Sequence, residues 1–308
     1  MKWFHNPFRL VRVVGTFFRT GAVEQVLKIT KVSKLIKFGI LFMGKPLIVF
    51  GIKGPYKKSP IVRALIALGP AYIKFGQLLS TRPDIVGADL ANELKVLQDS
   101  LDPFPTTEAK KIVNEELGSP VESIFSSFSD AVAAASIAQV HKATVKDTKE
   151  LVAVKILRPD VEKVFLKDLA ALLFLAKFIE IIIPSFRRLK PTEVINHFER
   201  LVREELDLRM EISAAAEFAE NTKSDRNFYV PKVIWSLSGR RVVTTEWVDG
   251  MSVGDIERIK KSGVDIESFA KRIIKTFLTQ ALRDGFFHGD MHQGNLKCRS
   301  DGTLIVMD

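Results

Sequence analysis

The spacing of apolar residues changes several times along this chain, and the order of these changes constrains its fold more than any other feature. Helical spacing comes first, over residues 61–68, 90–97 and 107–117. Short alternating runs then predict strands, a long helical pattern follows, and strands and helices come after it. The expected strands are 132–140, 141–145, 151–157, 230–237 and 241–247, and the expected helices are 192–221, 252–261 and 268–283. This order predicts an α+β fold in which a five-stranded antiparallel sheet accompanies one long helix.

Basic residues are concentrated at the start of the chain. The 308 residues carry a formal net charge of +10, but residues 1–60 hold 12 of the 46 Lys and Arg and, in Glu24, only one of the 36 Asp and Glu. The remainder is therefore nearly neutral, and we expect no nucleic-acid partner. A hydrophobic fraction of 46% excludes a disordered chain. The lone Cys298 excludes an internal disulfide and fits a reducing compartment.

The basic N-terminal segment alternates charge with apolar side chains. Lys28, Lys31, Lys34 and Lys37 recur every three residues between Ile29 and Phe38, which predicts a basic amphipathic helix on an anionic membrane surface. A solvated helix face and an organellar transit sequence are the alternatives. The segment lacks the uninterrupted apolar core of a signal peptide, and the apolar runs 35–52 and 169–184 contain charges that make them poor spanning helices.

Polar residues gather near the C-terminal end. The run His288-Gly289-Asp290-Met291-His292-Gln293-Gly294-Asn295 follows a helix, and a strand predicted over 302–308 ends in Asp308. Phosphoryl transfer needs one carboxylate for the acceptor, and an amide and a second carboxylate for magnesium, so Asp290, Asn295 and Asp308 fit these roles. A zinc-type site of His288, Asp290 and His292, which alternate along the chain, is the rival enzyme class.

A lysine and a group of acids suggest a second part of the same site. In Val152-Ala153-Val154-Lys155 the two valines would face the core and Lys155 the opposite side. On the long predicted helix, Glu205 falls inside the apolar stripe, Glu204, Asp207 and Glu211 line one edge, and Arg203 and Arg209 point elsewhere. Such acids need cations from other elements, and Lys155 and Lys74 are the candidates, although a solvated acidic face is the alternative.

Alanines stand where a glycine-rich phosphate loop would be expected before the Lys155 strand. The segment is Ala133-Ala134-Ala135-Ser136-Ile137-Ala138-Gln139-Val140. Each Cβ restricts φ and keeps the backbone farther from phosphate oxygens than glycine would. Taken alone, this segment would be interpreted as an ordinary small-residue strand.

Over residues 60–308 these motifs resemble, in order and spacing, the UbiB family of atypical protein-kinase-like proteins. The motifs are Lys74-Phe75-Gly76-Gln77, Ser80-Thr81-Arg82-Pro83-Asp84, Ala133 to His141, Val152 to Lys155, Glu205-Leu206-Asp207 and His288 to Asn295. The resemblance implies a protein-kinase-like small lobe with a helical N-terminal extension and a truncated helical large lobe. The corresponding parts are a membrane-proximal segment 1–58, the extension 59–128, the small lobe 129–247 and the start of the large lobe 248–308.

The resemblance also implies roles for individual residues. Lys155 resembles the ATP-phosphate lysine with Glu211 as its partner, Asp290 resembles the catalytic aspartate, and Asn295 and Asp308 resemble the magnesium ligands. The remaining implied ATP-binding positions are the loop Ala133, Ala134, Ala135, Ser136, Ile137 and Ala138, with Val140 on the strand after it, and Glu246 to Val248 as the hinge for adenine. Lys74 and Gln77 look like the motif that lies across the active site, held by Glu205 and Asp207.

The resemblance implies an ATP-dependent kinase or ATPase that supports ubiquinone biosynthesis at a membrane, with pathway lipids or proteins as partners. An extension across the cleft would exclude polypeptide acceptors and leave room for water or a small group. We expect the cytoplasmic face of a bacterial inner membrane, with mitochondria as the alternative. A nucleotide-binding scaffold with little turnover and a small-molecule phosphotransferase are alternative functions. Gly289 and Gln293 depart from the Ala and Pro of the family pattern, and the end at Asp308 indicates a fragment.

Overall fold

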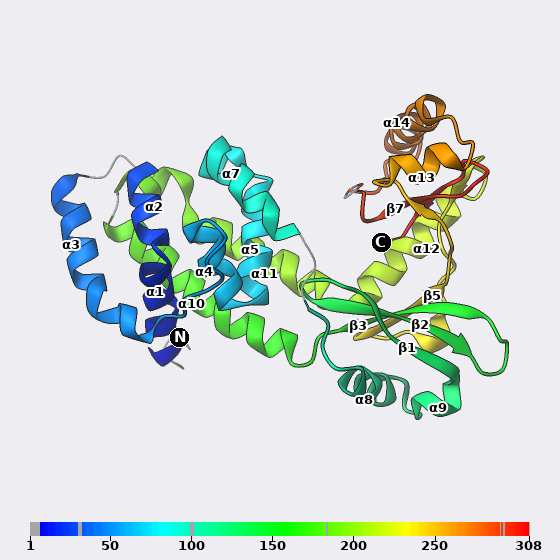
Figure 1. Cartoon of the computed structure of the whole chain (residues 1–308), viewed down its shortest axis with the longest axis horizontal. Coiled ribbons are helices and arrows are strands. Elements are labelled where there is room, and N and C mark those ends of the chain that lie inside the picture. The colour runs from blue at the N-terminus through cyan, green and yellow to red at the C-terminus, as the bar shows by residue number, and fades with distance from the viewer. Residues whose placement is uncertain are drawn as a thin grey trace. The chain divides into compact units, whose positions relative to one another are not determined.

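The computed structural model describes residues 7–29, 33–98, 102–182, 184–289, 291 and 293–307, and of residues 7, 29, 98 and 184–186 it describes the backbone alone. Contacts divide the chain into two compact units. The helical unit comprises Met1–Asp102, Ala134–Ile137 and Asp160–Arg203, and the mixed unit comprises Pro103–Ala133, Ala138–Pro159 and Glu204–Asp308. Figure 1 shows the elements of both units, coloured along the chain.

The helical unit consists of helices, several of which begin at a proline. Pro60 and Pro70 open α4 and α5, where a proline is tolerated because the first N–H groups of a helix have no intrahelical acceptor. Gly69 between them has a φ of +103°, which lets the chain turn from one helix into the next. The elements are α1 (Pro7–Thr20), α2 (Ala22–Ile29), α3 (Lys34–Gly44), η1 (Lys45–Phe50), α4 (Pro60–Leu68), α5 (Pro70–Ser80), α6 (Pro83–Val86), α7 (Ala88–Leu94), η2 (Lys95–Gln98), α10 (Val161–Ile182), η3 (Pro184–Leu189) and α11 (Pro191–Glu205), whose last two residues belong to the mixed unit.

Two glycines allow η1 to pack directly on the backbone of α1. A Cβ on Gly15 would lie 2.2 Å from the carbonyl oxygen of Leu47, and a Cβ on Gly51 would lie 2.2 Å from the carbonyl oxygen of Gly15. Hydrogen bonds join the same segments, because the Ile52 amide donates to Thr16 Oγ1 at 3.0 Å and Arg19 Nη1 donates to the Gly51 carbonyl at 2.9 Å. The backbones of α1 and η1 are therefore in direct contact, without side chains between them.

An ion pair with a buried carboxylate ties α1 to α10. Arg9 Nε donates to Asp168 Oδ1 at 2.7 Å, and the Asp168 side chain is 1% exposed. Burial raises the pKa of Asp168, while the guanidinium of Arg9 acts against this shift. Because a buried carboxylate without a cation is strongly destabilising, the pair holds α1 on the helical unit.

The predicted α+β fold and its antiparallel sheet are confirmed in the mixed unit. The sheet has the order β1-β2-β3-β5, formed by β1 (Phe125–Ala134), β2 (Ala138–Val145), β3 (Leu151–Leu157) and β5 (Val242–Glu246). Two helices, α8 (Thr106–Leu117) and α9 (Val121–Ile124), accompany it. Apolar side chains of α8 and of one sheet face form a common core, which includes Ala109, Ile112, Val113, Val121, Phe125, Ala143, Val152, Val154, Ile156 and Val242.

The expected fifth strand over 230–237 is wrong in detail. Only Val233 forms a bridge, opposite Thr245, and Trp235–Leu237 turns into the 3₁₀ helix η4. The segment still runs along β5, since the Ile234 amide donates to the Thr244 carbonyl and the Glu246 amide to the Lys232 carbonyl, both at 2.8 Å. Pro231, which has no N–H to donate, explains in part why the pairing stays short.

The long helix expected over 192–221 is broken, which is a second correction. The structure has α11 up to Glu205 and a separate α12 (Leu208–Thr222). Asp207 is the N-cap of α12: its Oδ1 accepts from the Arg209 amide at 3.2 Å. Its carboxylate also pairs with the Arg209 side chain at 2.6 Å, although Arg209 was expected to point elsewhere. The acids before and after the break therefore do not share one helix face.

The C-terminal part of the mixed unit has its own small core. A second sheet of order β4-β8-β7-β6 is formed by β4 (Phe228–Tyr229), β8 (Leu304–Val306), β7 (Leu296–Cys298) and β6 (Met251–Ser252). The predicted helices appear as α13 (Ile256–Lys261) and α14 (Ile266–Arg283). The buried residues of this core are Phe218, Met251, Ile259, Phe269, Leu296, Cys298, Leu304 and Val306.

The N-terminal lysines do not lie on one continuous helix, as the sequence predicted. Lys28 belongs to α2, and α3 begins anew at Lys34, where Ser33 Oγ accepts from the Ile36 amide at 3.4 Å. Lys31 lies outside the described residues. Among the helices that the structure describes, none has the length and apolar character needed to cross a membrane.

The backbone contact of α1 with η1 predicts that Gly15→Ala destabilises the protein. The added methyl group meets a carbonyl oxygen that has no side-chain freedom, so we expect a loss of about 1–3 kcal/mol in the free energy of unfolding. Gly39→Ala in α3 is the matched control, because its Cβ would have nothing within 4 Å, and its stability should be equal or higher. Urea denaturation measures both, and equal stability of the two variants would contradict the contact.

The broken helix predicts a capping role for Asp207. Asp207→Ala should lower the free energy of unfolding by about 1 kcal/mol, because the first turn of α12 loses its acceptor. Asp207→Ser keeps a capping oxygen without the charge and should recover most of this loss. Urea denaturation of the three proteins tests the assignment, which fails if the serine variant is as unstable as the alanine variant.

Candidate functional site

Lys155 lies on the sheet face opposite the α8 core. Val154 and Ile156, its neighbours on β3, are fully buried in that core. The register pairs Lys155 with Val140 of β2 and with Val243 of β5, and directly opposed residues project from the same face. The alternation expected from the sequence is therefore present, and it leaves the Lys155 ammonium on the face that the core does not use.

Glu211 of α12 pairs with Lys155. Lys155 Nζ donates to Glu211 Oε2 at 2.8 Å, and the two side chains are 19% and 32% exposed. Glu211 lies in the first turn of α12, so the Asp207 cap that starts this helix also fixes the position of Glu211. The ion pair that the resemblance implied is thus present, and it orients the lysine along the sheet face.

The other acids of this region have different surroundings. Glu205 is the last residue of α11, and the carboxylate of Asp207 is held by Arg209 of its own helix. The hydrogen bond from Arg209 lowers the pKa of Asp207, with a smaller opposing effect of burial. Lys74 and Gln77 lie on α5 of the helical unit, where Gln77 Nε2 donates to the Leu97 carbonyl at 2.7 Å. Their predicted place across the site, held by Glu205 and Asp207, remains a prediction.

The alanine-rich segment connects two strands instead of forming one. The strand expected over 132–140 is interrupted: β1 ends at Ala134 and β2 begins at Ala138. Ala133 and Ala135 are exposed, whereas Ser136 and Ala138 are buried. The segment is therefore a tight connection at the end of the hairpin. Its role as a phosphate loop, with Ala134 and Ile137, is a prediction.

The predicted hinge, Glu246 to Val248, continues β5 beyond the sheet. The Trp247 amide donates to the Leu151 carbonyl at 2.9 Å, and the Glu246 carboxylate accepts from the Tyr229 hydroxyl. Burial and then the Glu246 hydrogen bond raise the pKa of Tyr229. Val248 is buried, and its carbonyl accepts from Lys297 Nζ at 3.2 Å.

The sequence did not point to the side chains around Trp247. Lys142 of β2 and Lys297 of β7 lie over the Trp247 ring, with Nζ 4.6 and 5.6 Å from its centroid, and Trp247 Nε1 donates to Asp249 Oδ1 at 2.9 Å. Burial lowers the pKa of Lys297, and Asp249 acts against this shift. The only available signal was that Lys297 follows Asn295 by two residues, in a strand that was not predicted.

A hairpin positions one of the predicted magnesium ligands. Leu296 of β7 pairs with Val306 of β8, and the Met307 amide donates to the Asn295 carbonyl at 2.8 Å. Asn295 therefore lies opposite the residue that precedes Asp308. An amide oxygen and a carboxylate are the hard oxygen ligands that magnesium prefers. Asp290, His292 and Asp308 lie outside the described residues.

The described residues give no separate support to the rival metal site. Of its three members, only His288 is described, and its ring packs edge-on against Phe218 at 6.4 Å between centroids. Within the described part of the chain, no group of three or more His, Cys, Asp or Glu could hold a metal ion.

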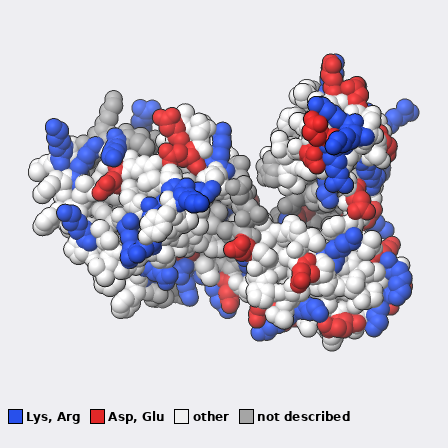
Figure 2. All heavy atoms as spheres, in the orientation of Figure 1, with Lys and Arg blue, Asp and Glu red and all other residues white. Residues whose placement is uncertain are grey.

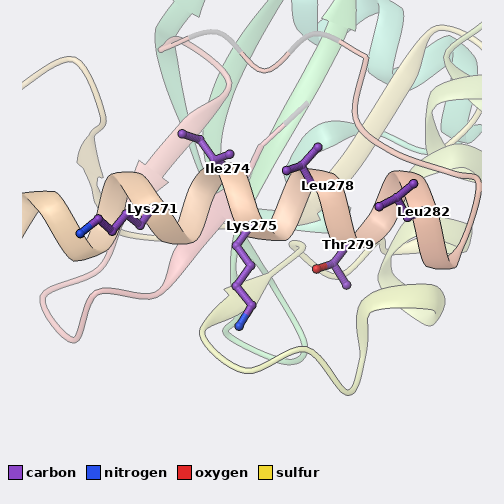
Figure 3. Close-up of a pocket in the computed structure, with 6 residues that line it drawn as sticks. All are labelled: Lys271, Ile274, Lys275, Leu278, Thr279 and Leu282. Carbon is purple, nitrogen blue, oxygen red and sulfur yellow. The ribbon is translucent and has the colours of Figure 1, made fainter.

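A shallow hollow lies on α14, and none of the predicted site residues lines it. It is lined by Lys271, Ile274, Lys275, Leu278, Thr279 and Leu282, which all belong to this helix. Figure 3 shows Ile274, Leu278 and Leu282 on one side of the helix axis and Lys275 and Thr279 on the other. The hollow has no charged or polar side chain from a second element, so it is a helix surface and not a catalytic pocket.

Comparisons with known proteins agree with the motifs. The ABC1 atypical kinase-like domain matches residues 96–308. Three relatives bear the name "Probable protein kinase UbiB". The protein of Aliivibrio fischeri is 41% identical over 258 residues, which are 82% of this chain and 47% of the relative. That of Marinobacter nauticus is 36% identical over 289 residues, with 94% and 52% covered. That of Pseudomonas aeruginosa is 37% identical over 292 residues, with 89% and 55% covered.

The chain spans about half the length of these curated relatives. The family match nevertheless covers more than half of the chain and includes the Lys155 strand, α12 and the Asn295 hairpin. The chain therefore belongs to the UbiB family of ABC1 atypical kinase-like proteins.

Proposed function

We propose that this chain is part of an ATP- and magnesium-dependent kinase or ATPase that supports ubiquinone biosynthesis. The observation that carries the proposal is the Lys155–Glu211 ion pair on the sheet face opposite the α8 core. A lysine held there by a carboxylate supplies a fixed positive charge for nucleotide phosphates. The relatives named as probable protein kinases support the same chemistry.

Each site residue has a defined task in this proposal. Lys155 neutralises phosphate charge and Glu211 keeps its ammonium in place. Asn295 and Asp308 would hold magnesium, which when bound supplies further positive charge to the triphosphate. Asp290 would orient the attacking hydroxyl or water and accept its proton. Water or a small or lipid-like molecule is the proposed acceptor.

ATP turnover by wild type and Asp290→Asn, measured together with ATP binding, tests the enzyme. The variant should bind ATP as wild type does but turn it over about 100-fold more slowly or worse, because a positioned base contributes at least that much. Lys155→Met is the contrasting control and should weaken ATP binding itself. Turnover that is equal in wild type and Asp290→Asn refutes the role of Asp290. Binding without turnover in either protein favours the nucleotide-binding scaffold instead.

We further propose that the protein works at an anionic membrane, in bacteria at the cytoplasmic face of the inner membrane. Leu35, Phe38 and Phe42 share one face of α3 and are 81%, 68% and 67% exposed, and the two phenyl rings stack at 6.1 Å. Val49 and Phe50 of η1 are exposed as well. Lysines flank this apolar surface, and the sequence has no Asp or Glu between Glu24 and Asp84.

Charge and apolar exposure together favour a lipid surface. Figure 2 shows mostly Lys and Arg at the α3 end of the helical unit, whereas both signs of charge mingle over the mixed unit. Exposed aromatic side chains enter the boundary between headgroups and acyl chains, and lysines beside them attract anionic headgroups.

Flotation with vesicles that contain phosphatidylglycerol tests this surface. The double change Phe38→Ser and Phe42→Ser should weaken binding about tenfold or more, since two exposed aromatic anchors are lost. Leu278→Ser with Leu282→Ser on α14 is the matched control, because it removes two exposed apolar side chains elsewhere. Raised salt should weaken wild-type binding. Equal flotation of the two double variants would contradict the assignment.

A further inference from the structure

The ammonium of Lys297 donates a hydrogen bond to the carbonyl group of Val248, the last residue of the predicted hinge. The lysine comes from β7, 49 residues after Val248, and its ammonium donates to the Val248 carbonyl oxygen at 3.2 Å. Gly250 makes room for this approach, since a Cβ there would lie 3.0 Å from the Lys297 Cβ. The contact thus joins two segments that are distant in sequence, and the missing side chain of Gly250 leaves the space for it.

Trp247, which precedes Val248 in the predicted hinge, lies on the same sheet face as Lys155. Lys155 pairs with Val243, and residues 245 and 247 follow on that face because side chains alternate along a strand. The Trp247 amide keeps this register by its bond to the Leu151 carbonyl at 2.9 Å. Four residues of strand span about 13 Å, so a nucleotide with its phosphates at Lys155 can reach Trp247 and Val248 with its base.

The ammonium of Lys297 adds hydrogen-bond donors to a position that would otherwise present only an acceptor to a purine base. A carbonyl alone accepts a hydrogen bond, whereas a lysine ammonium has three N–H donors and no acceptor. At position 6, adenine carries an amino group, which donates, and guanine carries O6, which accepts. The adenine amino group must therefore either share the Val248 carbonyl oxygen with a cation or displace Lys297 from it, while guanine O6 can accept a hydrogen bond from Lys297.

We propose that Lys297 determines the base selectivity of this site, by lowering its preference for ATP and allowing GTP to bind. The inference rests on the nucleotide-binding function proposed above. It concerns the Lys297 ammonium on the Val248 carbonyl, and not the phosphate contacts at Lys155 that ATP and GTP share.

Calorimetric titration of the 308-residue chain with MgATP and with MgGTP tests the proposal. The ratio of the two affinities is the readout, since a general loss of fold or of phosphate binding affects both nucleotides alike. Lys297→Met should shift the ratio toward ATP by about tenfold, which is the usual scale for one charged hydrogen bond. Lys297→Arg keeps the donor and should keep the wild-type ratio.

Lys142→Met is the matched control. It removes the other cation over the same Trp247 ring and should leave the ratio unchanged, because the Val248 carbonyl keeps its lysine. An unchanged ratio in Lys297→Met, or an equal shift in Lys142→Met, overturns the role of Lys297 while nucleotide binding stands. If wild type binds neither nucleotide, the proposed nucleotide-binding function fails, and the selectivity of Lys297 fails with it.

Discussion

The alternation of side chains along β3 is the constraint on which the rest of the mixed unit depends. Val152, Val154 and Ile156 have no exposed surface, and each packs against α8. A slip of the strand by one residue would turn Lys155 into that core and expose the three apolar side chains. Hydrophobic burial therefore fixes the register of β3, and this register in turn places Lys155 on the opposite face of the sheet.

A second fixed point lies at the start of α12. Lys155 pairs with Glu211, and the position of Glu211 depends on the residue at which α12 begins. Asp207 sets that beginning with its capping oxygen, and Arg209 holds the cap in turn. Two local interactions within three residues thus determine a contact between residues 56 positions apart in sequence.

The sequence predicted those parts of the fold that depend on local pattern. Alternation identified β3 and the side of Lys155, and helical spacing identified α13 and α14. It failed where one residue overrides a pattern: Asp207 breaks a helix that the apolar stripe would continue, and a segment containing Pro231 pairs only briefly with β5. The contact of Lys297 with Val248 could not be foreseen, because it joins two segments that only the tertiary fold brings together.

The contact of Gly15 with Gly51 determines how firmly the exposed side chains of η1 are held. Where two backbones touch, no side-chain rotation can loosen the contact, so η1 and the exposed side chains it carries are held by the main chain of α1. Arg9 and Asp168 fasten α1 in turn to α10. The exposed apolar residues of η1 therefore stand on a main chain that is already fixed, so binding through them would cost less backbone entropy than binding through a flexible loop.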